Sequence, residues 1–249
     1  MQFKTVQASA LKSCFEVLKD VINDVNMFFT EEGMTITALD NAKVALINMK
    51  LHANKFEEYE CTQPVTAGVN ITNFYKILKF ITSNDVLEIS ITDKELMKVA
   101  ISNDAKNSNT KFELSLLWIN DDVLEIPKLE PSCTTIIASI DFQRICRDMG
   151  NLSHDIYIFR TSNILKISCK GDFAKQETEI DTEQTGFEDN SIGNKYSLKY
   201  INLFTKATNM CSHMKIQQTF PTDRMPIIFV YDVANLGYIE FFLAAKLDE

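Results

Sequence analysis

The feature that most constrains the fold is a pattern of helices and strands that occurs twice along the chain. Apolar residues recur at helical spacing in four segments, so we expect helices over residues 9–25, 71–81, 139–152 and 197–208. The third segment begins 130 residues after the first, and the fourth begins 126 residues after the second. Each half therefore runs strand, helix, several strands, helix, several strands. This order predicts an α+β protein made of two copies of one unit.

Short runs rich in β-branched and aromatic residues occupy most of the remaining chain. Several alternate apolar and polar positions, which is typical of a sheet with one buried face. We expect strands over residues 33–40, 44–52, 86–93, 96–102 and 111–119, and again over residues 156–160, 164–171, 175–181, 214–220 and 227–233.

The segment WINDDVLEIPKLEPSC contains two prolines and an acidic pair, and it is typical of a connector between domains. The predicted organisation is an N-terminal domain over residues 1–117, a connector over residues 118–133 and a C-terminal domain over residues 134–249. Ser9 is the expected N-cap of the first helix.

Composition excludes several classes of protein. No apolar run reaches the roughly 18 residues of a membrane span, and the N-terminus MQFKTVQASALK lacks the apolar stretch of a signal peptide. We therefore expect a protein that stays inside the cell and does not enter a membrane. The six cysteines form no Cys-x-x-Cys pair, and Cys211 with His213 has no second pair at zinc-finger spacing. Reduced, mostly buried thiols and no metal or cofactor are the expectation.

The position of the cations within the chain is unusual for an acidic protein. The formal charge is −9, from 34 acids and 25 bases, which argues against binding to nucleic acid. Yet every predicted helix carries two cations on its polar side, and the second and fourth contain no acid. Lys199 and Lys206 are seven residues apart, about 20° in azimuth on an α-helix. Solvated lysines on amphipathic helices are one explanation; a basic helical face with an acidic exterior is the other.

Six stretches of the chain resemble proliferating cell nuclear antigen, the family of eukaryotic DNA sliding clamps that large DNA viruses also encode. They are FEVLKDVIND (15–24), AGVNITNFYKILK (67–79), VLEIPKLEPSC (123–133), FQRICRD (142–148), YINLFTKAT (200–208) and FFLAAK (241–246). They follow the family order over nearly the whole chain. The resemblance implies two similar domains per chain and a closed homotrimeric ring, in which helices line a channel and antiparallel sheets lie outside.

The resemblance also implies that the helix cations contact duplex DNA without reading its sequence. By position, the matching residues are Lys12, Lys19, Lys76, Lys79, Arg144, Arg147, Lys199 and Lys206. Ser13 stands where the family often has another lysine, so weaker DNA contact is expected from the first helix. Cations that touch only phosphates give salt-dependent, sequence-independent binding. The ring would catalyse no reaction and would tether a polymerase at high effective concentration.

Further positions match the family's protein interfaces. A pocket for short PIP-box-type motifs would recruit DNA polymerase, clamp loader, flap endonuclease and DNA ligase. Phe242 replaces the family's usual tyrosine, and Ala245 replaces a proline. Ring joints would pair strands near residues 109–117 and 175–182. The pocket positions are Leu39, Val44, Leu124, Ile126, Pro226 and a C-terminal strand from Phe242 to Lys246 that includes Ala244; the joint positions are Phe112, Leu114, Lys175, Glu177 and Glu179.

Three alternatives compete with the replicative clamp. One is a subunit of a heterotrimeric checkpoint-type clamp. Another is an enzyme that uses Cys146, whose neighbours Arg144 and Arg147 favour a reactive thiolate. The third is an interaction module that never encircles DNA. The resemblance favours a nuclear protein or one of a viral replication compartment. It places Ser162 or Asn163 where the family has a modifiable lysine, so ubiquitin-type modification is not expected there.

Overall fold

The computed structural model describes residues 1–93, 95–120, 124, 126, 130–182, 191–219 and 225–246. The chain divides into two compact units, and each unit includes a short segment from the other half of the sequence. Unit 1 comprises Met1–Asn41, Ile47–Glu125 and Asp232–Ile239, and unit 2 comprises Ala42–Leu46, Ile126–Tyr231 and Glu240–Glu249. These are units of contact, and the domain boundaries at residues 117 and 133 stay a prediction.

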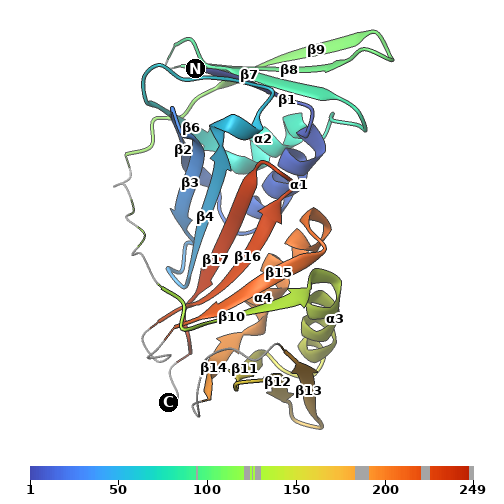
Figure 1. Ribbon diagram of the computed structural model, residues 1–249. Coiled ribbons are helices and arrows are strands. Elements are labelled where there is room, and N and C mark those ends of the chain that lie inside the picture. The colour runs from blue at the N-terminus through green and yellow to red at the C-terminus, as the bar shows by residue number, and fades with distance from the viewer. Residues whose placement is uncertain are drawn as a thin grey trace. The chain divides into compact units, whose positions relative to one another are not determined.

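The described residues of unit 1 form two α-helices and two groups of antiparallel strands (Figure 1). One sheet has the order β5-β1-β7-β8-β9, and β6, β2, β3 and β4 are neighbours, in that order, in another. The elements are β1 (Gln2–Thr5), α1 (Ala8–Leu18), β2 (Asp24–Thr30), β3 (Gly33–Leu39), β4 (Ala45–His52), a 3-10 turn η1 (Ala53–Lys55), β5 (Glu58–Glu60), β6 (Val65–Asn70), α2 (Ile71–Leu78), β7 (Val86–Ser90), β8 (Leu96–Asn103) and β9 (Ser108–Ser115).

Unit 2 repeats this order of elements. One sheet has the order β13-β12-β11-β14, and β10, β15, β16 and β17 are neighbours, in that order, in another. Strands β4, β16 and β17 have residues in both units. The elements are β10 (Cys133–Ala138), α3 (Ser139–Gly150), β11 (Asp155–Arg160), β12 (Ile164–Lys170), β13 (Lys175–Asp181), β14 (Ile192–Ser197), α4 (Leu198–Phe204), a 3-10 segment η2 (Thr205–Met210), β15 (His213–Gln218), β16 (Ile227–Val233) and β17 (Gly237–Leu243).

The two units bury aromatic side chains beneath their helices. In unit 1, Phe15 of α1 and Phe74 of α2 meet edge to face, with their ring centroids 4.7 Å apart. In unit 2, Phe142 of α3 and Phe204 of α4 both contact Phe229, at 5.6 and 6.1 Å. All five rings are buried. Because aromatic side chains bury large areas, these contacts fix the helices and leave their polar faces outward.

The structure corrects the predicted ends of two helices. The first ends at Leu18 rather than residue 25, since residues 24–29 pair with β6. Its N-cap is Gln7, and Ser9 lies inside the helix. The fourth predicted helix changes to 3-10 geometry at Thr205. There the Thr205 hydroxyl donates to Asn202 O and the Thr208 hydroxyl donates to Thr205 O, so side chains occupy carbonyls near the helix end.

The strand predictions were largely right but incomplete. All ten expected strands exist within a few residues of their predicted ends. The C-terminal strand ends at Leu243 rather than Lys246. The strands that were missed are defined by pairing with segments that are distant in the sequence. The residues of these strands therefore gave only a weak strand signal. The missed strands are β1, β2, β5, β6, β10 and β14.

Candidate nucleic-acid and protein interfaces

The cations of α1 and α2 meet around one buried tyrosine. The Lys19 ammonium lies 5.3 Å from the centre of the Tyr75 ring, and the Lys79 ammonium lies 5.7 Å from it. Tyr75 is 5% exposed, so its ring is held in place by packing. Lys19 also pairs with Asp20 at 2.9 Å, whereas Lys79 has no acidic partner among the described residues. The two helices therefore present their cations on one surface.

The Tyr75 hydroxyl stays protonated at neutral pH. Burial, together with a hydrogen bond to Glu16 of α1, raises the pKa of Tyr75 to about 12. Tyr75 thus links α1 to α2 through Glu16 while its ring attracts Lys19 and Lys79. Sequence reasoning missed this residue because one tyrosine among the apolar positions of a helix is an ordinary core residue. Lys79, four residues further along the helix, was the available signal.

The remaining cations of these two helices differ in their freedom to move. Lys76 is exposed, and its ammonium donates to Asn73 Oδ1 at 3.1 Å on the same helix. Lys12 is half-buried, and its ammonium donates to the carbonyl of Ile81 at 2.8 Å. Lys12 therefore joins α1 to the end of α2, whereas Lys76 can reach solvent by a change of rotamer.

A fifth cation lies beyond the end of α2, where the sequence did not indicate one. Lys106 is exposed in the turn between β8 and β9, and its ammonium donates to the Thr82 hydroxyl at 2.8 Å. Thr82 in turn donates its backbone N–H to Asp85 at 2.7 Å, and Asn103 donates to Asp85 at 2.6 Å. This network fixes the segment that follows α2 and places Lys106 beside it.

In unit 2, the helix arginines are paired with acids. Arg144 contacts Asp141 at 3.1 Å, and Arg147 contacts Asp148 at 3.5 Å. All four side chains are more than half exposed, so each ion pair is weak and exchanges with solvent. The basic face predicted for the third helix is therefore a face of mixed charge.

The two lysines predicted on the fourth helix lie on different kinds of backbone. Lys199 is in α4, exposed, with its ammonium 5.9 Å from the centre of the Tyr200 ring. Lys206 is exposed in the 3-10 segment η2. Since a 3-10 helix has three residues per turn, the azimuth of about 20° calculated for one continuous α-helix was wrong.

Strand β9 forms an open edge of its sheet. Among the described residues it pairs with β8 alone, over all eight of its own residues. Phe112 and Leu114 are half-buried on one side of the strand, and the Phe112 ring lies 5.1 Å from the ring of Phe80. Phe80 is 61% exposed at the end of α2. An edge strand bordered by exposed aromatic carbon is suited to pairing with another chain.

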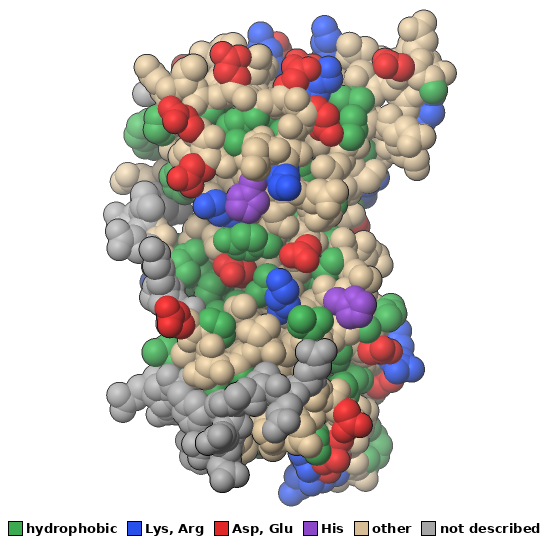
Figure 2. All heavy atoms as spheres, viewed as in Figure 1, with side chains coloured by type: hydrophobic (Ala, Val, Ile, Leu, Met, Phe, Trp, Pro, Cys, Tyr) green, Lys and Arg blue, Asp and Glu red, His purple; other side chains and the backbone are tan. Residues whose placement is uncertain are grey.

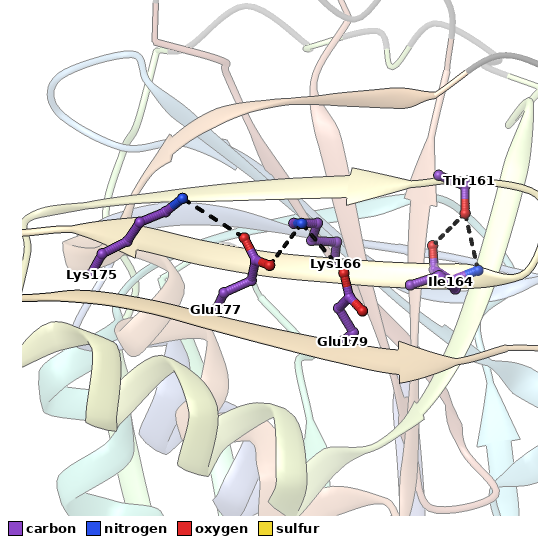
Figure 3. A network of polar contacts seen from close by, with 6 residues as sticks. All are labelled: Thr161, Ile164, Lys166, Lys175, Glu177 and Glu179. Carbon is purple, nitrogen blue, oxygen red and sulfur yellow. Dashed lines mark hydrogen bonds and ion pairs between the residues drawn. The ribbon is translucent and has the colours of Figure 1, made fainter.

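Strand β13 is the corresponding open edge in unit 2. Within the part of the chain that the structure describes, it pairs with β12 alone, and its residues alternate strictly between exposed and half-buried. Lys166 of β12 contacts Glu177 at 2.8 Å and Glu179 at 3.3 Å, and Lys175 contacts Glu177 at 3.9 Å (Figure 3). The hydrogen bond to Lys166 lowers the pKa of Glu177, and the hydrogen bond to Glu177 raises the pKa of Lys166. The charges of this edge therefore neutralise one another in part.

The residues predicted to bind partner proteins are in varied surroundings. In unit 2, Ala244 N donates to Val44 O at 3.1 Å, which joins two of them. Phe242 is 8% exposed, so little of its ring is available. The Lys246 ammonium contacts Asp155 at 2.6 Å, and its backbone N–H donates to Lys195 O. These contacts hold the segment after β17 in place although it is no longer a strand.

The other predicted partner-binding positions are exposed or half-buried. Leu39 is 37% exposed at the end of β3 in unit 1. Leu124, Ile126 and Pro226 are half-buried, and the connector residues between and around the first two lie outside the described part of the chain.

Acidic side chains are spread over the exterior, as the composition suggested. Glu58 and Glu60 on β5 and Glu177 and Glu179 on β13 are exposed. Figure 2 shows acidic, basic and hydrophobic side chains interspersed over the viewed face.

The cysteines behave as core residues rather than as reactive groups. All six are free thiols, and five are buried. Burial raises the pKa of Cys146 well above its ordinary value, which contradicts a reactive thiolate between two arginines. The described histidine, cysteine and acidic side chains form no group of three or more that could hold a metal ion. In the part of the chain that the structure describes, no helix has the length and apolarity that crossing a membrane requires.

The fold and these interfaces define a two-unit α+β protein with a basic surface on α1 and α2 and an open sheet edge at β9 and at β13. Family models for the N-terminal and C-terminal domains of proliferating cell nuclear antigen match residues 1–124 and 125–246. The chain belongs to the proliferating cell nuclear antigen family.

Similar proteins cover the whole chain. A probable DNA polymerase sliding clamp 1 of Paramecium bursaria Chlorella virus 1 is 33% identical over 254 residues, which is 98% of this chain and 96% of that protein. Proliferating cell nuclear antigen 2 of Drosophila melanogaster is 27% identical over 100% of this chain and 98% of its own. Proliferating cell nuclear antigen of Chaetomium thermophilum is 27% identical over 100% of this chain and 99% of its own.

Proposed function

We propose that this chain is the subunit of a DNA sliding clamp, a homotrimeric ring that encircles duplex DNA. The observation that carries the proposal is an open sheet edge in each unit, at β9 in unit 1 and at β13 in unit 2. A joint between two different edges is head-to-tail, and such joints close into a ring when the rotation permits. Phe112 and Leu114 on β9 would meet the strand that carries Lys175, Glu177 and Glu179.

The helix cations would contact the phosphates of the enclosed duplex. Lysine and arginine bind phosphate without reading bases, so the contact would be independent of sequence and sensitive to salt. The contributing residues are Lys12, Lys19, Lys76, Lys79, Arg144, Arg147, Lys199 and Lys206, to which the geometry of the α2 end adds Lys106. Loose contacts of this kind allow the ring to slide, and closure of the ring holds it on DNA.

The ring would act as a processivity factor and catalyse no reaction. A replicative polymerase bound to it stays near the primer end at high effective concentration. Clamp loader, flap endonuclease and DNA ligase would use the same docking surface, built from Leu39, Val44, Leu124, Ile126, Pro226, Phe242, Ala244 and Lys246. Family membership favours action in a nucleus or in a viral replication compartment.

Retention on circular and linearised plasmid tests the ring directly. The chain is loaded onto nicked circular duplex, washed at high salt and then followed before and after a single restriction cut. We expect the protein to stay on circles and to leave after linearisation, because only closure resists the wash. Equal loss from both forms would contradict the proposal.

A pair of variants separates failure of the ring from failure of DNA contact. Phe112→Glu adds a charge to the β9 edge and should reduce the mass in solution from three chains to one. Phe112→Tyr keeps the aromatic ring and should remain trimeric. If the wild-type chain forms a trimeric ring only after a second protein is added, the heterotrimeric alternative is favoured.

A further inference from the structure

The only tryptophan of the chain is almost fully exposed in unit 1. Trp118 is 91% exposed shortly after β9, and its neighbour Leu117 is 42% exposed. A large aromatic side chain left in water loses the stabilisation that its burial would give. Exposed tryptophan is common at the centres of protein interfaces. Neither the DNA contacts nor the proposed ring joint uses this residue.

The backbone on both sides of Trp118 is fixed, so the side chain projects from a rigid support. Leu117 N donates to Gly68 O at 2.7 Å, and Asn26 Nδ2 donates to Ile119 O at 3.2 Å. The approach at Gly68 is so close that a Cβ there would lie 2.2 Å from Leu117 O. Substitution of Gly68 would therefore dislodge the support.

Trp118 borders a hollow of about 520 Å³ whose lining lies wholly within unit 1. The start of β6, the segment 117–119 and residues 91–93 line this hollow. Asp93 is the one charged side chain among the described residues of the lining. Asp93 Oδ1 accepts the backbone N–H groups of Glu95 and Leu96, both at 2.9 Å, which fixes the carboxylate in position.

The hollow runs along an open strand edge. One edge of β6 pairs with β2, and among the described residues its other edge pairs only where Gly68 meets Leu117. Residues two apart in a strand direct their backbone groups the same way. Since Gly68 uses its carbonyl on the outer side, the N–H and carbonyl of exposed Thr66 also face outward, into the hollow.

We propose that this hollow binds an extended segment of a partner protein that adds a strand to β6. The backbone of the segment would exchange hydrogen bonds with Thr66, and an apolar side chain would cover Trp118 and Leu117. A lysine or arginine of the segment would lie near Asp93, since the hollow offers one carboxylate and the chain as a whole is acidic. Strand addition supplies affinity through the backbone and specificity through alternate side chains. The site goes beyond the proposed clamp function and needs neither DNA nor the β9 and β13 edges.

Trp118 itself reports the binding, because its fluorescence is the only tryptophan signal of the chain. A phage library of random twelve-residue peptides is selected on the wild-type protein in the absence of DNA. We expect enriched sequences in which apolar residues alternate with lysine or arginine. Synthetic copies should shift the Trp118 emission to shorter wavelength and protect it from acrylamide quenching.

Three variants test the geometry. Trp118→Asp should weaken the selected peptides by at least about tenfold, as expected for a central aromatic contact. Thr66→Pro removes only the outward N–H, which an edge strand tolerates, and should weaken them several-fold. Val6→Asp changes another exposed apolar residue of unit 1, outside the hollow, and should leave peptide binding unchanged.

Three outcomes would overturn the proposal. Absence of peptides that depend on Trp118, or equal binding to Thr66→Pro, overturns the strand-addition site. A change in oligomer mass on Trp118→Asp would assign this surface to contact between copies and would also overturn the proposal. Retention of each variant on circular plasmid shows whether the clamp function survives, so the two proposals fail separately.

Discussion

Helices α2 and α3 lie in different units and differ in how their cations are held. Each carries two cations three residues apart, Lys76 with Lys79 and Arg144 with Arg147. The arginines of α3 each contact a neighbouring acid. On α2, by contrast, the described contacts of Lys76 and Lys79 are with an amide and with an aromatic ring.

The difference shows that the charge of a helix face is set by its acids as much as by its cations. A phosphate that approaches α3 must compete with Asp141 and Asp148, whereas α2 offers its lysines without that competition. Tyr75 attracts Lys79 through its ring and adds no negative charge at neutral pH. We therefore expect α2 to contribute more to DNA binding than α3, although both were predicted alike.

The largest expected effect concerns what the two helices share, which is a buried aromatic anchor. Phe74 of α2 is 1% exposed and Phe142 of α3 is 0% exposed. Phe74→Ala and Phe142→Ala should each lower the free energy of unfolding by about 3–5 kcal/mol, through lost burial and the cavity left behind. Urea unfolding followed by far-UV circular dichroism measures the loss.

Thr72→Ala is the matched control, because Thr72 is exposed on α2 and should change stability by less than about 0.5 kcal/mol. A loss confined to one of the two phenylalanine variants would show that the helices are not anchored alike. The comparison of their charges would then have to be repeated at matched stability.

Removal of the cations gives the next largest effect. Lys76→Ala with Lys79→Ala removes two phosphate contacts from a chain and should flatten the dependence of log affinity on log salt by about 1.8. Arg144→Ala with Arg147→Ala should flatten it by less than half as much, because those arginines are already paired. Fluorescence anisotropy with a labelled linear duplex, over a range of potassium chloride concentrations, gives both slopes. Equal flattening by the two double variants would break the proposed difference between the helices.

Neutralising the acids should make α3 resemble α2. Asp141→Asn with Asp148→Asn releases both arginines, and exposed ion pairs are worth about 0–1 kcal/mol each. DNA affinity at low salt should therefore rise about two- to fivefold. Glu88→Gln, an exposed acid on β7 in unit 1, is the control and should have a smaller effect. An unchanged affinity in the α3 variant would mean that the aspartates do not restrain the arginines.

The sequence predicted the α+β class and the order of the elements that it identified, because hydrophobic periodicity is a local property that survives in both units. It also located the arginines of α3 and the aspartate three residues from Arg144. It could not locate Tyr75 between Lys19 and Lys79, since that contact depends on how α1 packs against α2. The early end of α1 depends on strand pairing with residues almost fifty positions away, which overrides the helical pattern of residues 19–25.

The open edges illustrate the same limit. Alternating residues indicate that β9 and β13 are strands, but which strands lie at the edge of a sheet depends on the partners available to each. Resemblance to a family suggested these two strands as ring joints, and their residues alone did not. Trp118 is a further case, because composition shows that the chain has one tryptophan but not that it is exposed.

The smallest expected effect appears on acidification and concerns the segment that follows α2. After α2, burial alone would raise the pKa of Asp85, but hydrogen bonds from Asn103 and Thr82 outweigh it and hold that pKa below its ordinary value. A carboxyl whose pKa is lowered by folding stabilises the protein above the pKa of the unfolded chain, about 3.9 for aspartate. That stabilisation is lost as the pH falls through the folded-state pKa.

Asp85→Asn should therefore be less stable than the wild type at pH 7, and the difference should shrink as the pH falls below about 4. Urea unfolding at a series of pH values measures the difference directly. Asp104→Asn, an exposed change in the turn that carries Lys106, should show no such convergence. If the gap between Asp85→Asn and the wild type stays constant down to low pH, Asp85 acts through the shape of its side chain rather than through its charge. In that case the segment beyond α2 is held by packing rather than by the charge of Asp85.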